Sequence, residues 1–395
     1  MHAHSRWVAV ALAAALTSPL AAQDVTFRGQ VRPRYEYRDP AGGGKDEFTS
    51  MRVRAALAAK LDEHVAVFIQ LQDVRLFGEE TSTLADFSAD HFDLHQGYLR
   101  FTGRRLDWMT TTVGRQEVNF GGQRLVGAVG WTQQGRAFDG VRLDAGTGWG
   151  SLAFIGFKLA EETAPKIAND MELYGAYATV RNTGPGALDL YWLYDRTEGS
   201  VDTNEHTFGA RYAFKGVVNG RVEGSFQAGT RAAQDLSAFM FGARLGRTFA
   251  GGRAGVTLWY DYLSGDDDLA DGKAKVFNTL FATNHKFYGF ADLFLNIPVH
   301  TGGFGLQDLA VKLHWKPADG ISVGADYHSF RAAESNALAE AHFGDELDLT
   351  LSHAYTSHLT VVTGLSFVFQ DKGFAEIGRL SEDMTWGYVM LNAHF

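Results

Sequence analysis

Polar and apolar residues alternate along nearly the whole chain. Between Phe27 and Arg38 every second residue is polar or charged, and the residues between them are mostly apolar. Alternation with a period of two is typical of a β-strand that has one apolar face and one face exposed to water, which we call the wet face. The next segment repeats the pattern, with Arg52, Arg54 and Lys60 on its wet face. The N-terminal segment is therefore predicted to form long strands with one polar and one apolar face.

The same alternation continues to the C-terminus and predicts eighteen strands. They lie at 27–38, 48–60, 64–76, 92–102, 107–116, 135–144, 149–158, 170–181, 187–196, 205–215, 219–231, 237–248, 253–264, 309–316, 320–331, 344–354, 359–370 and 384–395.

The connections between these strands alternate in length, and this distinguishes two all-β architectures. The short ones lie at 61–63, 103–106, 145–148, 182–186, 216–218, 249–252, 317–319 and 355–358, and those between them are mostly longer. A soluble β-sandwich, the alternative for strands with one apolar face, has no reason to sort its loops in this way. A single transmembrane antiparallel β-barrel has short periplasmic turns, long extracellular loops and an even strand number. The sequence therefore predicts such a barrel, of about 18 strands.

The last predicted strand ends on an aromatic residue. Trp386 and Tyr388 alternate with apolar or small residues, and Phe395 closes the chain. A terminal aromatic after such a strand resembles the assembly signal of bacterial outer-membrane proteins. We therefore expect Phe395 to engage the barrel assembly machinery, and we expect outer-membrane lipid and lipopolysaccharide to surround the barrel.

Residues 1–22 have the features of a signal peptide. Arg6 supplies the positive charge, an apolar run follows from Trp7 to Leu16, and small residues precede Gln23. No later stretch approaches the roughly 18 unbroken apolar residues of a membrane-spanning helix. The remaining chain, 23–395, shows no linker or shift in composition. We expect one exported domain in the bacterial outer membrane.

The longest connection, 265–308, changes character along its length. It begins with the acidic residues Asp266 to Asp268 and Asp271, then becomes aromatic and apolar. Such a loop is expected to fold over or into the barrel mouth, with two additional strands as the alternative. The acidic group is either a solvated loop or a site for a divalent cation.

Composition excludes several functions. The 395 residues include 45 Gly and no Cys, so disulfides, thiolate catalysis, Fe–S clusters and Cys-based zinc sites are absent. Asp and Glu number 46 against 36 Lys and Arg, and the net charge of −10 argues against a nucleic-acid partner.

Three stretches resemble the alginate export family of outer-membrane barrels. They are Val113-Gly114-Arg115-Gln116-Glu117 with Gly122-Gln123-Arg124-Leu125, Gly135 to Leu143, and Thr283 to Phe290. The resemblance covers essentially the whole mature chain. It implies an eighteen-stranded barrel whose arginine-lined lumen passes an anionic polyuronate outward. One departure is the short turn at Thr356 to His358, because the alginate exporter has a long turn late in the barrel.

The wet faces of the predicted strands are rich in arginine although the protein is acidic. A guanidinium binds a carboxylate bidentately, and residues two apart along a strand repeat every 6.5 to 7 Å or so. We therefore take these side chains as the candidate solute-binding residues, the alternative being that they pair with lumen acids and keep the wall hydrated. The twelve candidates are Arg28, Arg32, Arg34, Arg38, Arg52, Arg54, Arg100, Arg136, Arg142, Arg211, Arg221 and Arg244.

Other chemistry is poorly supported by the sequence. His91, Asp93 and His95 share a strand face but have no clear further ligand, so no metal site is predicted. No Gly-x-Ser-x-Gly motif is present, and neither an enzyme nor a cofactor is expected. Lumen aromatics such as Tyr98 either stack on sugar rings or belong to the interfacial girdles of the barrel. Arg115 falls on the lipid-facing parity, which requires a bulge or a position beyond the membrane.

These observations predict an outer-membrane channel for anionic carbohydrate, with export of an alginate-like polyuronate as the leading function. The first alternative is an anion-selective porin that imports small organic anions or oligosaccharides. The second is a barrel whose loops act as an adhesin or receptor.

Overall fold

The computed structural model describes residues 24–40, 43–79, 92–103, 106–161, 169–199 and 201–395, so the predicted signal peptide at 1–22 lies outside the described residues. Its strands are β1 (Asp24–Pro40), β2 (Asp46–Lys60), β3 (Val65–Leu76), β4 (Phe92–Thr102), β5 (Met109–Gln116), β6 (Phe138–Gly146), β7 (Gly150–Ala160), β8 (Asn169–Thr183), β9 (Gly186–Gly199), β10 (Thr203–Phe214), β11 (Asn219–Arg231), β12 (Gln234–Phe249), β13 (Ala254–Leu263), β14 (Lys273–Ala274), β15 (Leu306–Trp315), β16 (Ile321–Arg331), β17 (His342–Ala354), β18 (Leu359–Gln370) and β19 (Met384–His394). The helical segments are η1 (Ala250–Gly252), η2 (Asn284–Lys286), α2 (Ile297–His300) and α3 (Lys372–Glu376). None of these described helices has the length and apolarity needed to cross a membrane.

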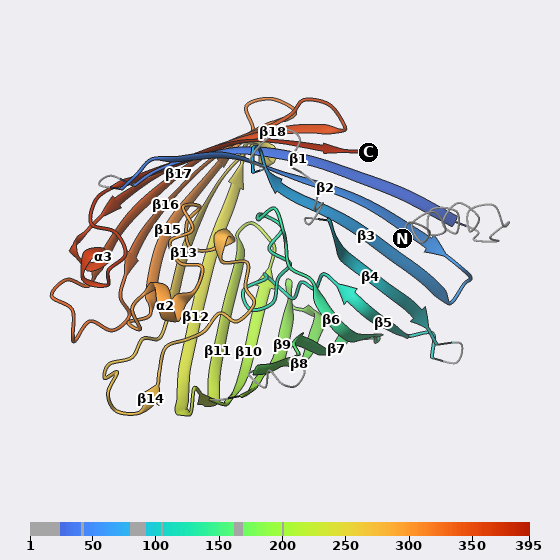
Figure 1. The fold of residues 1–395 in the computed structure, drawn as a ribbon, viewed down its shortest axis with the longest axis horizontal. Coiled ribbons are helices and arrows are strands. Elements are labelled where there is room, and N and C mark those ends of the chain that lie inside the picture. The colour runs from blue at the N-terminus through green and yellow to red at the C-terminus, as the bar shows by residue number, and fades with distance from the viewer. Residues whose placement is uncertain (1–23, 41–42, 80–91, 104–105, 162–168, 200) are drawn as a thin grey trace, which may run out of the picture.

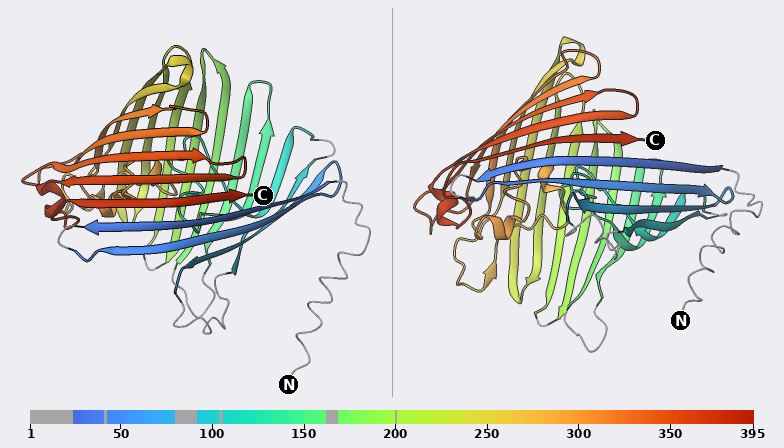
Figure 2. Two further views of the ribbon diagram at one scale, coloured as in Figure 1. Left: turned by 90° about the horizontal axis from the view of Figure 1, so that it is seen from above. Right: turned by 45° about the horizontal axis from the view of Figure 1, so that its top comes forward.

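Eighteen of the described strands close into one antiparallel ring (Figure 1). Each strand pairs with its neighbours in sequence, and β1 pairs with both β2 and β19, which brings the first and last strands side by side (Figure 2). The short strand β14 stands apart, because it runs parallel to β12 while β13 pairs directly with β15. The predicted eighteen-stranded barrel is confirmed.

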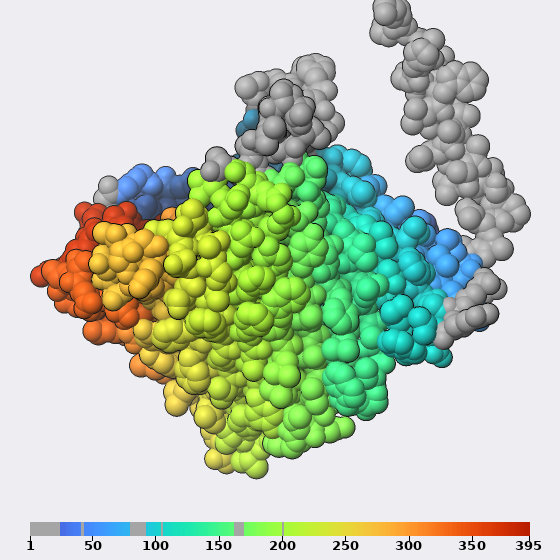
Figure 3. Space-filling model, turned by 90° about the horizontal axis from the view of Figure 1, so that it is seen from below, coloured from blue at the N-terminus to red at the C-terminus, as the bar shows by residue number. Residues whose placement is uncertain are grey.

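Side chains of each strand alternate between the inside and the outside of the ring. On β12, Leu236 and Met240 are buried inside, whereas Phe239 and Leu245 on the opposite parity are 50% and 53% exposed. The strands from β7 to β13 pair in order, and their residues, green to yellow in Figure 3, form a continuous surface there. An outer face with this many exposed apolar side chains matches the lipid-facing band of a transmembrane barrel.

The ring has two different ends. Short connections such as 61–64 between β2 and β3 and 215–218 between β10 and β11 lie at one end, which we call the turn end. Longer connections lie at the other end, the loop end, and include 117–137 and 264–305. The alternation of short and long connections in the sequence arises from this difference.

The β5–β6 loop (117–137) and the β13–β15 loop (264–305) lie inside the ring and bind each other. The backbone N–H of Gly127 donates to the carbonyl oxygen of Phe281 at 2.9 Å, and the N–H of Phe281 donates to that of Leu125 at 2.8 Å. Val126 and Phe281 form an isolated parallel bridge. In the described part of the β13–β15 loop, β14 is the one short strand, so two additional barrel strands at 265–308 are not formed.

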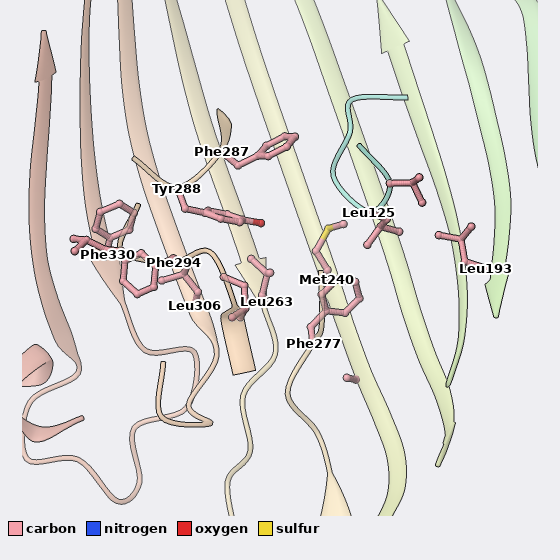
Figure 4. Packing of buried hydrophobic residues seen from close by; sticks show 14 of the residues in the cluster. Leu125, Leu193, Met240, Leu263, Phe277, Phe287, Tyr288, Phe294, Leu306 and Phe330 are labelled. Carbon is pink, nitrogen blue, oxygen red and sulfur yellow. The ribbon is translucent and has the colours of Figure 1, made fainter. Parts of the chain in front are cut away.

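Buried apolar side chains attach both loops to most of the barrel wall. Leu125, Phe287 and Tyr288 from the loops belong to one cluster with Met240 of β12 and Leu263 of β13 (Figure 4). Burial of a large apolar side chain stabilises a fold by about 1.5–3 kcal/mol. Within the described residues, the buried members of this cluster come from the two loops, from strands between β6 and β19 and from the β16–β17 and β18–β19 connections, and none comes from β1 to β5.

The chain ends at the seam between β1 and β19. The N–H of Gly29 donates to the carbonyl oxygen of Phe395 at 2.7 Å, and the N–H of Phe395 donates to that of Gly29 at 3.1 Å. The Phe395 ring lies directly over Gly29, where a Cβ atom would come within 2.1 Å of its Cζ. Phe395 is nevertheless 79% exposed.

Candidate functional site

Arginines of β1 and β2 point into the ring and hold the backbone of the β5–β6 loop. Arg32 is 5% exposed and donates to the carbonyl oxygens of Gly130 at 2.8 Å and Thr132 at 2.7 Å. Its Nε also donates to Gln133 Oε1 at 2.9 Å. Five donors in a fixed planar arrangement allow one guanidinium to bind several carbonyl groups at once.

The neighbouring arginines repeat this arrangement. Arg34 donates from Nη1 to the carbonyl oxygen of Trp131 at 2.9 Å, and its Cζ lies 4.4 Å from the centroid of the Trp131 ring. Arg52 donates to the carbonyl oxygens of Thr132 and Gln133, both at 3.2 Å. These inward arginines therefore anchor a loop across the lumen.

Arg54 takes part in a compact group with His95 and Glu117. Arg54 Nη1 lies 3.2 Å from Glu117 Oε1, and His95 Nε2 lies 2.7 Å from the same oxygen. Gln70 pairs with Gln96 and Leu71 with Leu94, so His95 is the extra residue of a β-bulge in β4. A bulge can redirect a side chain, and here it brings the His95 ring to the loop.

Gly135 allows the loop to approach this group. Its φ is +69°, and a Cβ atom there would lie 2.8 Å from Arg54 Nη2 and 3.2 Å from His95 Cε1. Burial alone raises the pKa of the Glu117 carboxyl, but the hydrogen bond with His95 and the charges of Arg54 and Arg52 outweigh it and hold the pKa below its usual range. Glu117 therefore remains ionised beside Arg54.

Two of the predicted site residues line a cavity at the turn end, and a third lies near the loop end. Arg28, Arg100 and Lys60 line a cavity of about 460 Å³ between the start of β1 and the end of β4. Arg38 lies near the loop end, where its Nη2 donates to the carbonyl oxygen of Ala291 at 3.4 Å.

The prediction that Arg136 belongs to a strand is wrong. Strand β6 begins at Phe138, and Arg136 lies in the preceding loop, where its Nη1 donates to the carbonyl oxygens of Gly127 at 3.3 Å and Ala282 at 3.2 Å. The left-handed backbone at Gly135 interrupts the strand pattern. Burial lowers the pKa of the Arg136 guanidinium.

Two other candidates are paired with carboxylates. Arg142 Nη2 lies 2.6 Å from Asp144 Oδ1, and Arg211 Nη1 lies 2.7 Å from Asp189 Oδ2. The alternative expected from the sequence, that lumen arginines pair with lumen acids, thus describes part of the set.

A larger cavity of about 600 Å³ at the turn end is lined by β10 to β15 and is strongly basic. No carboxylate of the described residues lines it, and its basic side chains are Arg211, Arg221, Arg244, Arg247 and His314 from the strands and Lys215 from the β10–β11 turn. We call it the basic chamber.

Two guanidinium groups of the basic chamber have donors without a described hydrogen-bond partner, although Arg221 Nε lies 3.6 Å from Glu223 Oε2. Nε and Nη2 of both Arg221 and Arg244 are buried without a hydrogen-bond partner. Arg244 Cζ lies 3.5 Å from the centroid of the Trp259 ring. Burial and the nearby charges of Arg244, Arg221, Arg211 and Arg124 lower the pKa of the Lys286 ammonium at the adjoining loop. The chamber therefore has a positive field and unused donors, which together favour an anion.

Arg124 is a key residue that the predicted set omitted. It is 1% exposed, and its Nη1 donates to Asp261 Oδ2 at 2.7 Å and to the Tyr288 hydroxyl at 2.9 Å. Its Cζ lies 4.3 Å from the centroid of the Phe287 ring. Arg124 lies in a loop, outside any strand alternation, but the Gly122 to Leu125 stretch that resembles the family contains it.

The acidic group of the β13–β15 loop and Arg115 each form ion pairs with oppositely charged side chains. Asp267 and Asp271 of the acidic group each contact Lys275 Nζ, the second at 2.8 Å. Among the described residues, no three His, Asp or Glu side chains are arranged to hold a metal ion. Arg115 Nη1 lies 2.6 Å from Asp139 Oδ2.

The predicted lumen aromatics divide into two groups. Trp386 and Tyr388 are buried against Trp131, whose ring centroid lies 4.8 Å from that of Tyr388. Tyr98 lies beside Phe68, with 5.2 Å between ring centroids, and lines the turn-end cavity beside Arg100. Tyr98 is thus the one of these three that faces open space.

Known proteins resemble this chain in sequence and in fold. The sequence matches the profile of a family described as alginate export over residues 23–370. Similar crystal structures include OccK3 (OpdO) of Pseudomonas aeruginosa, with a TM-score of 0.67, 14% identity and coverage of 95% of this chain and 96% of that chain. OccAB4 of Acinetobacter baumannii has a TM-score of 0.66 and 12% identity, covering 96% and 100%. At these identities the similarity concerns the fold. No curated protein matches the sequence.

Proposed function

The chain belongs to the alginate export family, and from this premise we propose that it passes anionic carbohydrate across the bacterial outer membrane by diffusion, with an alginate-like polyuronate as the exported solute. The coarser statement follows from the family and the fold: the protein is an outer-membrane β-barrel channel and not an enzyme. The proposal concerns the solute and the direction of its movement.

The basic chamber is the observation that carries this proposal. Carboxylates of a polyuronate are bound well by guanidinium groups, and Arg221 and Arg244 have buried donors without partners. Short turns of such barrels face the periplasm, so the chamber lies where an exported chain enters. A positive chamber raises the local concentration of anions and thereby their rate of passage.

A second candidate, import of small organic anions or oligosaccharides, is favoured by the inner loops. The β5–β6 and β13–β15 loops occupy the middle of the ring, and the cavities beside them have volumes of about 300 to 600 Å³. Cavities of this size are typical of sites for small molecules. A short solute fits this space without displacing the loops.

Current block by polyuronate tests the proposal in planar bilayers. Polyuronate is added to one chamber at a time, and we expect stronger block from the turn-end side, weakened by raised salt because salt screens the charges. The double variant Lys215→Gln/Arg244→Gln removes two charges from the basic chamber and should reduce this block, because the chamber then collects less of the polyanion at the turn-end mouth.

Lys158→Gln/Arg196→Gln is the matched control, because it removes two charges next to Glu172 outside the chamber. Polyuronate should block the current of this control variant as strongly as that of the parent. Anion conductance without any polyuronate block would favour the small-anion porin. Absence of conductance in the parent would favour the adhesin or receptor.

A further inference from the structure

We propose that the solute crosses the barrel along the wall of β3 to β6, through three adjoining cavities, and that Arg100 is the specificity-determining cation on this route. The route itself depends only on the protein being a channel. The role of Arg100 rests on the proposed function in one respect, namely that the solute is an anion.

The three cavities follow one another from the loop end to the turn end. The first, of about 300 Å³, is lined by Gln72, His95 and Gln134 among others. The second, of about 350 Å³, is lined by residues that include Gln96 and Thr110. The third is the turn-end cavity of about 460 Å³. The first two lie along β3 to β6, and the third continues along β3 and β4 and also reaches the start of β1 and the end of β2.

Shared lining residues and one side-chain contact show which of the cavities meet and which are separated. Tyr98 and Arg100 line both the second and the third cavity, so these two spaces meet at β4. His95 lines the first cavity and Glu117 lines the second, and the 2.7 Å contact between these side chains separates them. The Arg54–His95–Glu117 group is therefore the narrow point of the route.

The rest of the wall is closed to a solute by the inner loops. The buried apolar cluster attaches both loops to strands between β6 and β19, and within the described chain it has no buried member on β1 to β5. On β1 and β2 the loop is held by Arg32, Arg34 and Arg52 instead. Beyond the basic chamber, fully buried Arg124 and Tyr288 fill the lumen. Among the described residues, the wall of β3 to β6 is left as the open side.

Arg100 lines two cavities of this route, whereas Arg28 lines only the third and Arg142 only the second. Arg142 and Arg54 contact Asp144 and Glu117, whereas the described contacts of Arg100 are with Thr112 Oγ1, 3.4 Å from its Nε, and with the Tyr98 ring, 5.4 Å from its Cζ. Arg100 thus makes no direct ion pair with a described carboxylate, and Asp24, Asp62 and Glu63 line the same turn-end cavity. A cation beside an aromatic ring suits a uronate, which has both a carboxylate and an apolar ring face.

The absence of cysteine in the chain permits a direct test of the route. Thr110→Cys places one thiol in the second cavity, and Thr257→Cys places one in the basic chamber on the opposite wall. Each purified variant is labelled with a bulky uncharged maleimide, and its single-channel conductance is compared before and after labelling. Heat-modifiable migration on gels confirms that each variant is folded.

We expect labelling to halve the conductance of Thr110→Cys at least, and to leave that of Thr257→Cys nearly unchanged, because the chamber is closed toward the loop end. The reverse result, or two labelled variants that conduct like the unlabelled protein, overturns the route. Because an uncharged label blocks any ion, this outcome is independent of whether the solute is an anion.

Arg100→Gln tests the specificity residue separately. It should reduce both the anion preference of the channel and the block by polyuronate, whereas Lys158→Gln, outside the three cavities, should change neither. If labelled Thr110→Cys loses conductance but the parent shows no anion preference, the route stands and the proposed solute is wrong. If the parent is anion-selective and Arg100→Gln is equally so, Arg100 does not determine specificity.

Discussion

Arg32 and Gln133 bind each other in both directions across the lumen. Arg32 Nε donates to Gln133 Oε1 at 2.9 Å, and Gln133 Nε2 donates to the carbonyl oxygen of Arg32 at 3.2 Å. Gln133 Nε2 also donates to Ser50 Oγ on β2 at 2.9 Å. This reciprocal contact fixes the β5–β6 loop to β1 and β2, whose arginines are among the candidate solute-binding residues.

Replacement of Arg32 should therefore loosen a loop rather than weaken solute binding. Arg32→Gln removes several hydrogen bonds from a charged donor, each worth about 1.5–3 kcal/mol. We expect noisier single-channel current and faster proteolysis within 117–137, with polyuronate block unchanged at equal conductance. Weaker block with a quiet current and an intact loop would show that Arg32 contacts the solute.

Asp261 is expected to hold the inner loops through Arg124. Asp261→Asn removes one of two carboxylates that contact the buried Arg124 guanidinium, and Glu223 remains 3.4 Å from its Nε, so the cost is below the roughly 3–5 kcal/mol of an uncompensated buried charge. The temperature at which the barrel unfolds on heated gels should fall clearly. Asp319→Asn is the control, because Asp319 is exposed and its contact with Arg253 is 3.6 Å long, so this change should leave the unfolding temperature in place.

Low pH should open the narrow point at Glu117. The pKa of this carboxyl lies below its usual range, so its contact with Arg54 persists from neutral pH down through the ordinary Glu value and is lost only as the pH falls through the lowered pKa. We expect constant conductance down to about pH 4.3, the ordinary Glu value, and an increase below it.

Glu117→Gln should show this increased conductance already at neutral pH and should lack the step at low pH. A variant that retains the step would assign the titration to another group.

Deletion of Phe395 separates assembly from stability. The ring is 79% exposed, and the residue contributes two backbone hydrogen bonds with Gly29, so its loss should change the unfolding temperature of purified barrel only slightly. We expect much less barrel in the outer membrane and more degraded protein in the periplasm. Phe369→Ala, which removes another exposed aromatic ring, should assemble normally. Normal amounts of the deletion variant in the membrane would contradict a role in assembly.

The barrel could be predicted because its strands obey a local rule. A period of two places Arg32 and Arg52 inside and Phe239 outside from the sequence alone, and β1 pairs with β19 as an even strand number requires. One error, at Arg136, occurs because Gly135 adopts a positive φ and interrupts the alternation before β6 begins.

The partners of the lumen arginines could not be predicted in the same way. Arg32 binds carbonyl groups about a hundred positions away, and backbone carbonyls leave no signal in side-chain alternation. Arg124 was missed because its partner Asp261 is 137 residues distant and the loop has no period. Such contacts depend on how two long loops fold against each other inside the ring.

The reversal potential under a salt gradient tests the central claim most directly. Purified protein in a planar bilayer separates two chambers of unequal salt, and the voltage of zero current reports which ion passes more easily. The account predicts anion preference in the parent, a shift toward cations in Lys215→Gln/Arg244→Gln, and no shift in Lys158→Gln/Arg196→Gln. Cation preference in the parent, or equal shifts in the two double variants, would contradict an anion channel supplied by the basic chamber.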